Sequence, residues 1–100
     1  MIAINGRLDA AGVDGIETRF TALAVATGKN ALVDLSNVTF LASMGIRMLI
    51  STSRAMRLKK VKMVLFGAQG LVKEVLDHAS LNELIPIVAD ERQAVEWLKS

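Results

Sequence analysis

Short apolar runs alternate along this chain with stretches in which apolar residues recur at helical spacing. Two of the runs, residues 31–35 and 61–66, are compact and bounded by polar or glycine residues, which is typical of buried strands. Weaker runs occupy residues 1–5 and 84–88, and Pro86 in the last run favours the edge of a sheet. Strands that alternate with helices are expected to pair in parallel, because each helix carries the chain back across the sheet.

The helical stretches complete this pattern. In the second of them Ile46 and Ile50 share an apolar face, and in the last Trp97 is expected in the core. Asp90 has the form of a helix N-cap with a reciprocal Gln93. The expected fold class is α/β, one domain over residues 1–100 with a mixed but mainly parallel sheet of four to five strands and about four helices. The predicted helices cover residues 8–26, 43–58, 70–78 and 91–98.

Composition excludes several kinds of site. The 100 residues include no Cys and a single His, which excludes disulfides, thiolate metal sites and two-histidine chemistry. No apolar run reaches the roughly 18 residues that a membrane helix needs, and the first residues lack the basic flank of a secretion signal. We therefore expect a cytoplasmic domain without membrane insertion, cofactor or metal.

Charge is concentrated in the middle of the chain. Residues 35–73 carry seven Lys and Arg and no Asp or Glu, whereas residues 74–100 carry six acidic and two basic residues. The basic segment would attract an acidic partner or a phosphate, but such charges also simply solvate a helix and the turn after it. Direct nucleic-acid binding is not expected, because no aromatic residues are interleaved with the basic ones.

Catalytic motifs are missing from the sequence. It contains no glycine-rich phosphate loop and no pair of carboxylates at an informative spacing. His78, near the end of the third predicted helix, is expected to be solvated or to cap that helix. Asp34 has no evident partner as a general base. The chain is therefore not expected to be an enzyme.

The most informative stretch is residues 33–46, where a buried strand is expected to enter a polar turn, a short apolar segment and then a helix. Ser43 stands at the start of that helix, where its hydroxyl would cap a free amide, and Gly45 is small enough for close packing. A second interpretation starts from the preference of a helix N-terminus for anions. Phosphorylation of Ser43 would add a charge of about −1.5 to −2 there, and Arg47 one turn on would pair with it. The spacing alone leaves both interpretations open.

Residues 34–49 read D-L-S-N-V-T-F-L-A-S-M-G-I-R-M-L, and residues 6–9 read G-R-L-D. Both segments resemble the signature of the STAS domain family, which comprises the anti-sigma factor antagonists and their relatives. The likeness continues through the strand at residues 63–66, the helix ending near His78 and the I-P-I segment at residues 85–87. It implies a STAS-like domain over nearly the whole chain, with the family's first strand short or missing.

The resemblance implies a partner switch. In that family the unphosphorylated antagonist binds an anti-sigma factor, a serine kinase of the histidine-kinase-like ATPase superfamily. Phosphorylation of the serine, here Ser43, dissociates the complex, and a phosphatase of the PP2C type restores the binding form. The chain itself is expected to be a monomer or a weak dimer. The residues expected to contact the partner are Thr39, Ala42, Ser43, Met44, Gly45, Arg47 and Met48.

One departure from the family pattern supports an alternative. The acid that directly precedes the serine in the family is Ala42 here. The family also includes members that are never phosphorylated and act as scaffold subunits of lipid- or anion-transport complexes or of stress-signalling assemblies. In that role a negative charge at Ser43 would leave partner affinity nearly unchanged.

Overall fold

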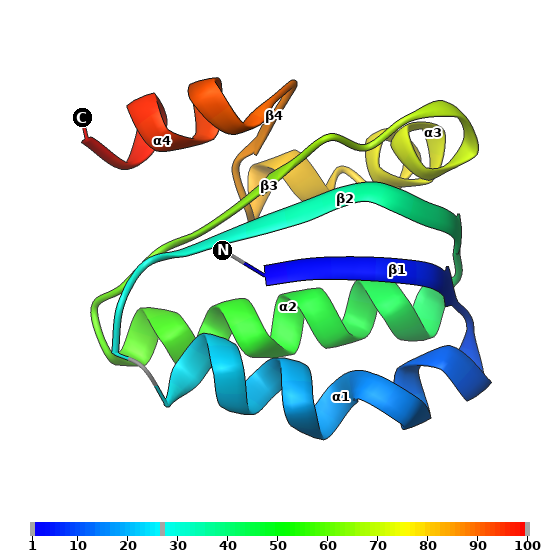
Figure 1. The fold of residues 1–100 in the computed structure, drawn as a ribbon, viewed down its shortest axis with the longest axis horizontal. Coiled ribbons are helices and arrows are strands. Elements are labelled where there is room, and N and C mark those ends of the chain that lie inside the picture. Colours follow the sequence, from blue (N-terminus) through cyan, green and yellow to red (C-terminus); the bar gives the residue numbers. More distant parts are fainter. Residues whose placement is uncertain (1, 27, 100) are drawn as a thin grey trace.

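The computed structural model describes residues 2–26 and 28–99, which form a sheet flanked by helices (Figure 1). All pairs among the described strands are parallel, and the strand order follows the chain, β1-β2-β3-β4. The predicted α/β class is confirmed, although these strands form a purely parallel sheet rather than a mixed one. The strands are β1 (Ile2–Leu8), β2 (Ala31–Leu41), β3 (Met63–Phe66) and β4 (Ile87–Val88). The helices are α1 (Ala10–Val25), α2 (Ser43–Leu58), α3 (Gly70–His78) and α4 (Glu91–Lys99), with a 3₁₀ helix at Leu81–Glu83.

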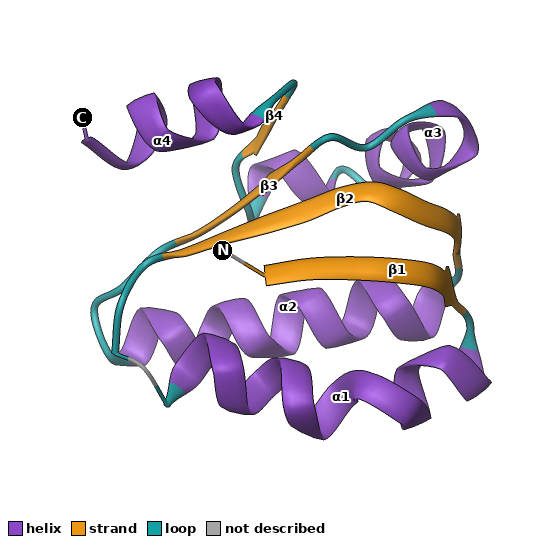
Figure 2. Cartoon of the chain, in the orientation of Figure 1, coloured by secondary structure: helices purple, strands orange, loops and turns teal. Residues whose placement is uncertain are grey.

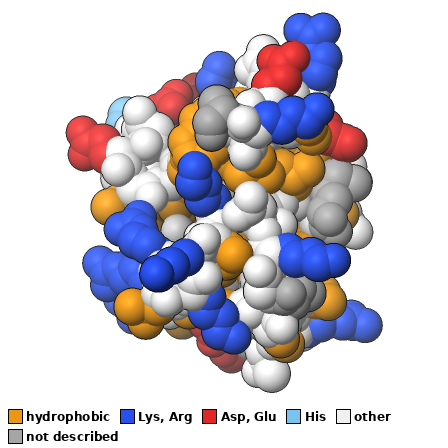
Figure 3. Space-filling model, turned by 90° about the vertical axis from the view of Figure 1, so that its left-hand side faces the viewer, with side chains coloured by type: hydrophobic (Ala, Val, Ile, Leu, Met, Phe, Trp, Pro, Cys, Tyr) orange, Lys and Arg blue, Asp and Glu red, His pale blue; other side chains and the backbone are white. Residues whose placement is uncertain are grey.

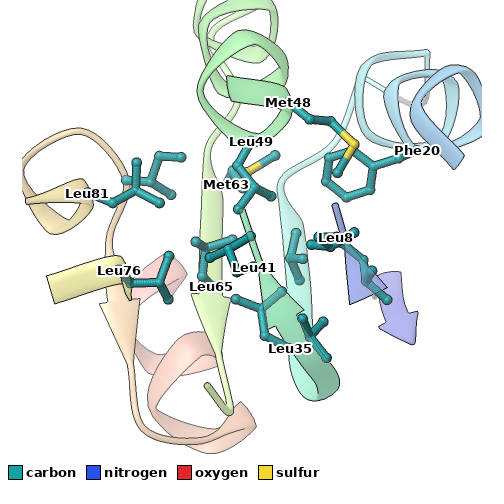
Figure 4. Packing of buried hydrophobic residues seen from close by; sticks show 14 of the residues in the cluster. Leu8, Phe20, Leu35, Leu41, Met48, Leu49, Met63, Leu65, Leu76 and Leu81 are labelled. Atoms are coloured by element: carbon teal, nitrogen blue, oxygen red, sulfur yellow. The ribbon is translucent and has the colours of Figure 1, made fainter. Parts of the chain in front are cut away.

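The helices cover the two faces of the sheet unequally. In Figure 2, α1 and α2 lie together next to β1, away from α4. Side chains of α1, α2 and α3 join one large core on one face, whereas α4 packs Ala94 against Val64 and Phe66 on the other. Successive side chains of β3 point to opposite faces of the sheet, so β3 contributes residues to both clusters. The larger core includes Phe20, Met48, Leu49, Leu65 and Leu76 (Figure 4).

Strand β2 is longer than the sequence predicted. The polar turn expected after residue 35 does not form, and the strand continues to Leu41, which lies opposite Leu8 of β1. Its buried residues are first two and then three positions apart, because the register with β1 shifts twice and each shift inserts an extra residue into β2. The expected turn is therefore a pair of β-bulges.

Two predictions about side chains have different outcomes. Ile46 and Ile50 of α2 both pack against the larger core as half-buried residues, so the predicted apolar face is confirmed. Trp97 is 38% exposed rather than in the core, since only the Ala94 side of α4 meets the sheet. The buried residues of α2 are Gly45, Met48, Leu49, Thr52 and Met56.

Two further predictions are confirmed. Strand β4 lies at the edge of the sheet, as Pro86 indicated. Asp90 Oδ1 accepts a hydrogen bond from the Gln93 amide at 2.9 Å, and Gln93 Oε1 accepts one from the Ala89 amide at 3.2 Å. Among the described residues, none of the helices combines the length and the apolar character needed to cross a bilayer.

Candidate functional site

Two helices begin side by side at the carboxyl ends of β1 and β2. Strands β1 and β2 are neighbours that end together, with Leu8 opposite Leu41. Helix α1 starts two residues after the first strand and α2 two residues after the second, so both N-termini lie at the right of Figure 1. The Ala42 amide donates to the carbonyl oxygen of Leu8 at 3.0 Å, which holds the start of α2 against the end of β1.

The third residue of each helix is a glycine packed against the end of β1. A Cβ on Gly12 would overlap the carbonyl oxygen of Arg7. A Cβ on Gly45 would lie 2.7 Å from Leu41 Cδ1 and 2.9 Å from the carbonyl oxygen of Leu8. Such distances are too short for ordinary packing, so both helix starts reach their positions only because these side chains are absent.

Helix α1 has a complete N-cap. The Asp9 carboxylate accepts a hydrogen bond from the Gly12 amide at 2.9 Å and another from Arg7 Nε at 3.0 Å. The Gly12 hydrogen bond, followed by that from Arg7, holds the pKa of Asp9 below its ordinary value. The positive end of α1 is therefore already matched by a carboxylate.

Helix α2 has no such cap. Its N-cap position is Ala42, which has no side-chain oxygen, and Ser43 is the first residue inside the helix, with its side chain exposed. The prediction that Ser43 caps the helix is wrong, because an N-cap must have extended backbone and that place belongs to Ala42. The Gly45 amide donates to the Ala42 carbonyl oxygen at 3.0 Å, so the amides of Ser43 and Met44 are the ones left without a partner within the helix. The positive end of α2 therefore has a hydroxyl beside it and no carboxylate to match it.

The predicted contact residues divide into exposed and buried ones. Thr39, Met44 and Arg47 are exposed around the start of α2. Met48 is 1% exposed and points toward Phe20 of α1 (Figure 4). Its prediction as a partner contact is wrong, because residue 48 follows the buried face of the helix.

Gly45 is buried as well, between Leu8 and Leu41. Its predicted contact with a partner is therefore wrong. Its role is the close approach of α2 to the strands, which the sequence had also suggested.

Two residues near the site were missed from the sequence. Arg7 and Phe40 face each other across β1 and β2, with the guanidinium carbon 4.5 Å from the centre of the ring. Both are exposed beside the two helix starts. Parallel pairing of the two strands would have revealed them, since it sets residues 6–9 beside residues 38–42.

The remaining candidates lie elsewhere. His78 is the exposed last residue of α3. Asp34 Oδ1 accepts hydrogen bonds from the amide and the hydroxyl of Ser36, at 2.9 and 2.6 Å, so it braces β2 where β3 ends its pairing. Over residues 2–26 and 28–99, no three His, Cys, Asp or Glu side chains are grouped in a way that would hold a metal ion.

The family model for the STAS domain matches residues 1–94. The chain belongs to the STAS domain family. In this STAS domain the matched motif of residues 34–49 forms the second part of β2 and the first two turns of α2. The residues that carried the resemblance are thus the ones that build the start of α2.

Solved structures share the fold of this STAS domain. TM1081 of Thermotoga maritima, provisionally described as an anti-sigma factor antagonist, has a crystal structure with a TM-score of 0.78 and 16% identity. That match covers 96% of this chain and 83% of TM1081, and its NMR structure gives a TM-score of 0.77 at 15% identity, with 97% and 78% covered. The anti-sigma factor antagonist SpoIIAA in its unphosphorylated form gives 0.67 at 16% identity, with 98% and 86% covered. No curated protein matches the sequence significantly.

Proposed function

We propose that this STAS domain is an anti-sigma factor antagonist, a protein-binding module rather than an enzyme, and that it docks its partner over the start of α2. The observation that carries the proposal is the exposed Ser43 at the first position of a helix with no side-chain cap. The family match and the likeness to two proteins described as antagonists support the general role.

The proposed mechanism is a switch in charge. Unmodified, Ser43 presents a small hydroxyl among Thr39, Met44 and Arg47, a surface that a partner covers without burying a net negative charge. A phosphate on Ser43 brings about −1.5 to −2 charges and is stabilised by the free amides of the helix start and by Arg47. The fold therefore tolerates the modification, while a docked partner would have to bury a hydrated anion.

The partners that suit this mechanism are a kinase and a phosphatase. The proposed binding partner is an anti-sigma factor that is itself a serine kinase of the histidine-kinase-like type, and it supplies the ATP. A PP2C-type phosphatase would remove the phosphate and restore binding. This chain would then serve as ligand and substrate, without a cofactor of its own.

Phosphate transfer to Ser43 tests the proposal. Incubation with the purified cognate anti-sigma factor kinase and ATP is expected to add one phosphate, located by tandem mass spectrometry at Ser43. The Ser43→Ala variant is expected to remain unmodified. Phosphate on that variant, or none on the unaltered protein, would contradict the assignment of Ser43 as the acceptor.

A second candidate function is favoured by Ala42, which leaves α2 without the acid of the family pattern. It is an unphosphorylated scaffold subunit of a transport or stress-signalling complex. The Ser43→Asp variant separates the two functions, with Ser51→Asp as a control that adds the same charge to an exposed position of the same helix about 12 Å away. The switch predicts that only Ser43→Asp weakens partner binding, by about 2–5 kcal/mol, whereas the scaffold predicts unchanged binding for both variants.

A further inference from the structure

A pocket of about 380 Å³ lies at the opposite end of α2 from Ser43, about 20 Å away along the helix. The end of α2, the start of β3, the 3₁₀ helix and α4 surround it. Figure 3 looks onto this end of the molecule, where Lys and Arg side chains surround exposed hydrophobic surface. The proposed partner switch makes no use of this pocket.

The polar part of the pocket favours an anion. Arg57 and Lys62 both line it, and Glu83 is the one carboxylate among its described lining residues. Arg57 Nη2 donates to the carbonyl oxygen of Leu84 at 3.2 Å, and this bond leaves further N–H groups for a ligand. A guanidinium presents a planar fork of N–H donors that matches carboxylates and phosphates.

The pocket also has an apolar part. Trp97 of α4 is 38% exposed and lines the pocket beside Pro86 and Leu84, which is itself 45% exposed. Lys62 Nζ lies 5.1 Å from the centre of the Trp97 ring. Because this ammonium group lies over the ring, a small anion that pairs with Lys62 is brought against the exposed indole, which offers apolar contact to the same molecule.

We propose that this pocket binds a small anion carried on a planar ring, either an aromatic carboxylate or an aromatic phosphate. Its anionic group pairs with Arg57 and Lys62, and its ring packs against Trp97. The proposal does not depend on phosphorylation of Ser43 or on the anti-sigma factor.

Trp97 is the only tryptophan of a chain that has no tyrosine, so its fluorescence reports on this site directly. Titration with benzoate and with phenyl phosphate is expected to give a saturable change in that fluorescence. Cyclohexanecarboxylate and inorganic phosphate are expected to bind at least roughly tenfold more weakly, because each lacks the planar ring. A preference between benzoate and phenyl phosphate identifies which anion the pocket selects.

The Arg57→Gln and Lys62→Gln variants are each expected to weaken binding about tenfold. Lys73→Gln is the matched control, because it removes one positive charge from α3, away from the pocket lining. Lys62→Gln keeps the test valid if loss of the Arg57 bond to Leu84 disturbs the fold. No saturable signal, equal binding by the pocket variants and the control, or inorganic phosphate binding as tightly as phenyl phosphate would overturn the proposal.

Discussion

Helices α1 and α2 begin side by side with the same arrangement of strand end and glycine, but they differ at the N-cap residue. Both follow a parallel strand, and both place a glycine at their third residue, Gly12 and Gly45, against the end of β1. Helix α1 is capped by Asp9, which is itself paired with Arg7. Helix α2 has Ala42 at the corresponding place, followed by the exposed Ser43.

The difference separates what packing requires from what it leaves free. Each helix needs a glycine at its third residue, because both helices closely approach the end of β1. The cap is present only at α1, so α2 keeps its positive end open to an added anion. The open helix start is the one that carries the candidate phosphorylation site.

The largest expected effect comes from filling the shared glycine positions. Gly12→Ala and Gly45→Ala are expected to destabilise the protein by about 1–3 kcal/mol each, because their methyl groups meet backbone oxygens of β1. Gly15→Ala in α1 is the control, since its methyl group would meet nothing within 4 Å. It is expected to stabilise by about 0.5–1 kcal/mol. Urea denaturation measures all three, and equal effects would contradict the shared packing plan.

Removal of the existing cap is expected to have a smaller effect. Asp9→Ala takes away the acceptor for the Gly12 amide and should lower the free energy of unfolding at neutral pH. Because the pKa of Asp9 is lowered in the folded state, its contribution is present above about pH 4 and is lost as the pH falls through the folded pKa. The variant should therefore lose less stability than the unaltered protein over that acidic range. Parallel acid dependence of the two proteins would show that Asp9 does not cap α1.

Installing the missing cap should have the opposite sign. Ala42→Asp gives α2 the carboxylate that α1 already has and is expected to stabilise the protein by about 0.5–1 kcal/mol. Ala42→Asn separates hydrogen bonding from charge, because it supplies an acceptor without ionising. Thermal denaturation at neutral pH compares them, and destabilisation by both substitutions would mean that the start of α2 is not open.

The smallest effect concerns the exposed pair between the two helix starts. Arg7 and Phe40 are expected to couple by about 0.5–1 kcal/mol through the guanidinium over the ring. A double-mutant cycle of Arg7→Gln and Phe40→Leu measures that coupling free of their separate contributions. A coupling indistinguishable from zero would remove this pair from the description of the site.

Regular patterns in the sequence predicted most of the fold. Compact apolar runs gave β3 and the start of β2, and Pro86 indicated the edge strand. The prediction of a turn at residues 36–41 was wrong, because these residues continue strand β2. Two bulges space the buried residues three positions apart instead of two, and this spacing cannot be told from a turn by local sequence rules. The burial of Met48 was missed because it depends on how far α2 rotates toward α1.

The sequence singled out Ser43 as the candidate, but not its surroundings. Ser43 was singled out from the motif, yet its place inside the helix depends on Ala42 taking the cap position. The proximity of Arg7 and Phe40 follows from strand pairing across more than thirty residues of chain, which spacing along the sequence does not encode.

The most direct test compares two forms of one preparation, phosphorylated at Ser43 and then dephosphorylated, in calorimetric titrations against the cognate anti-sigma factor. Tight binding is expected for the dephosphorylated form alone, with affinity lower by roughly a hundredfold or more for the phosphorylated form. Equal affinity of the two forms would contradict the claim that the uncapped start of α2 is a surface switched by charge.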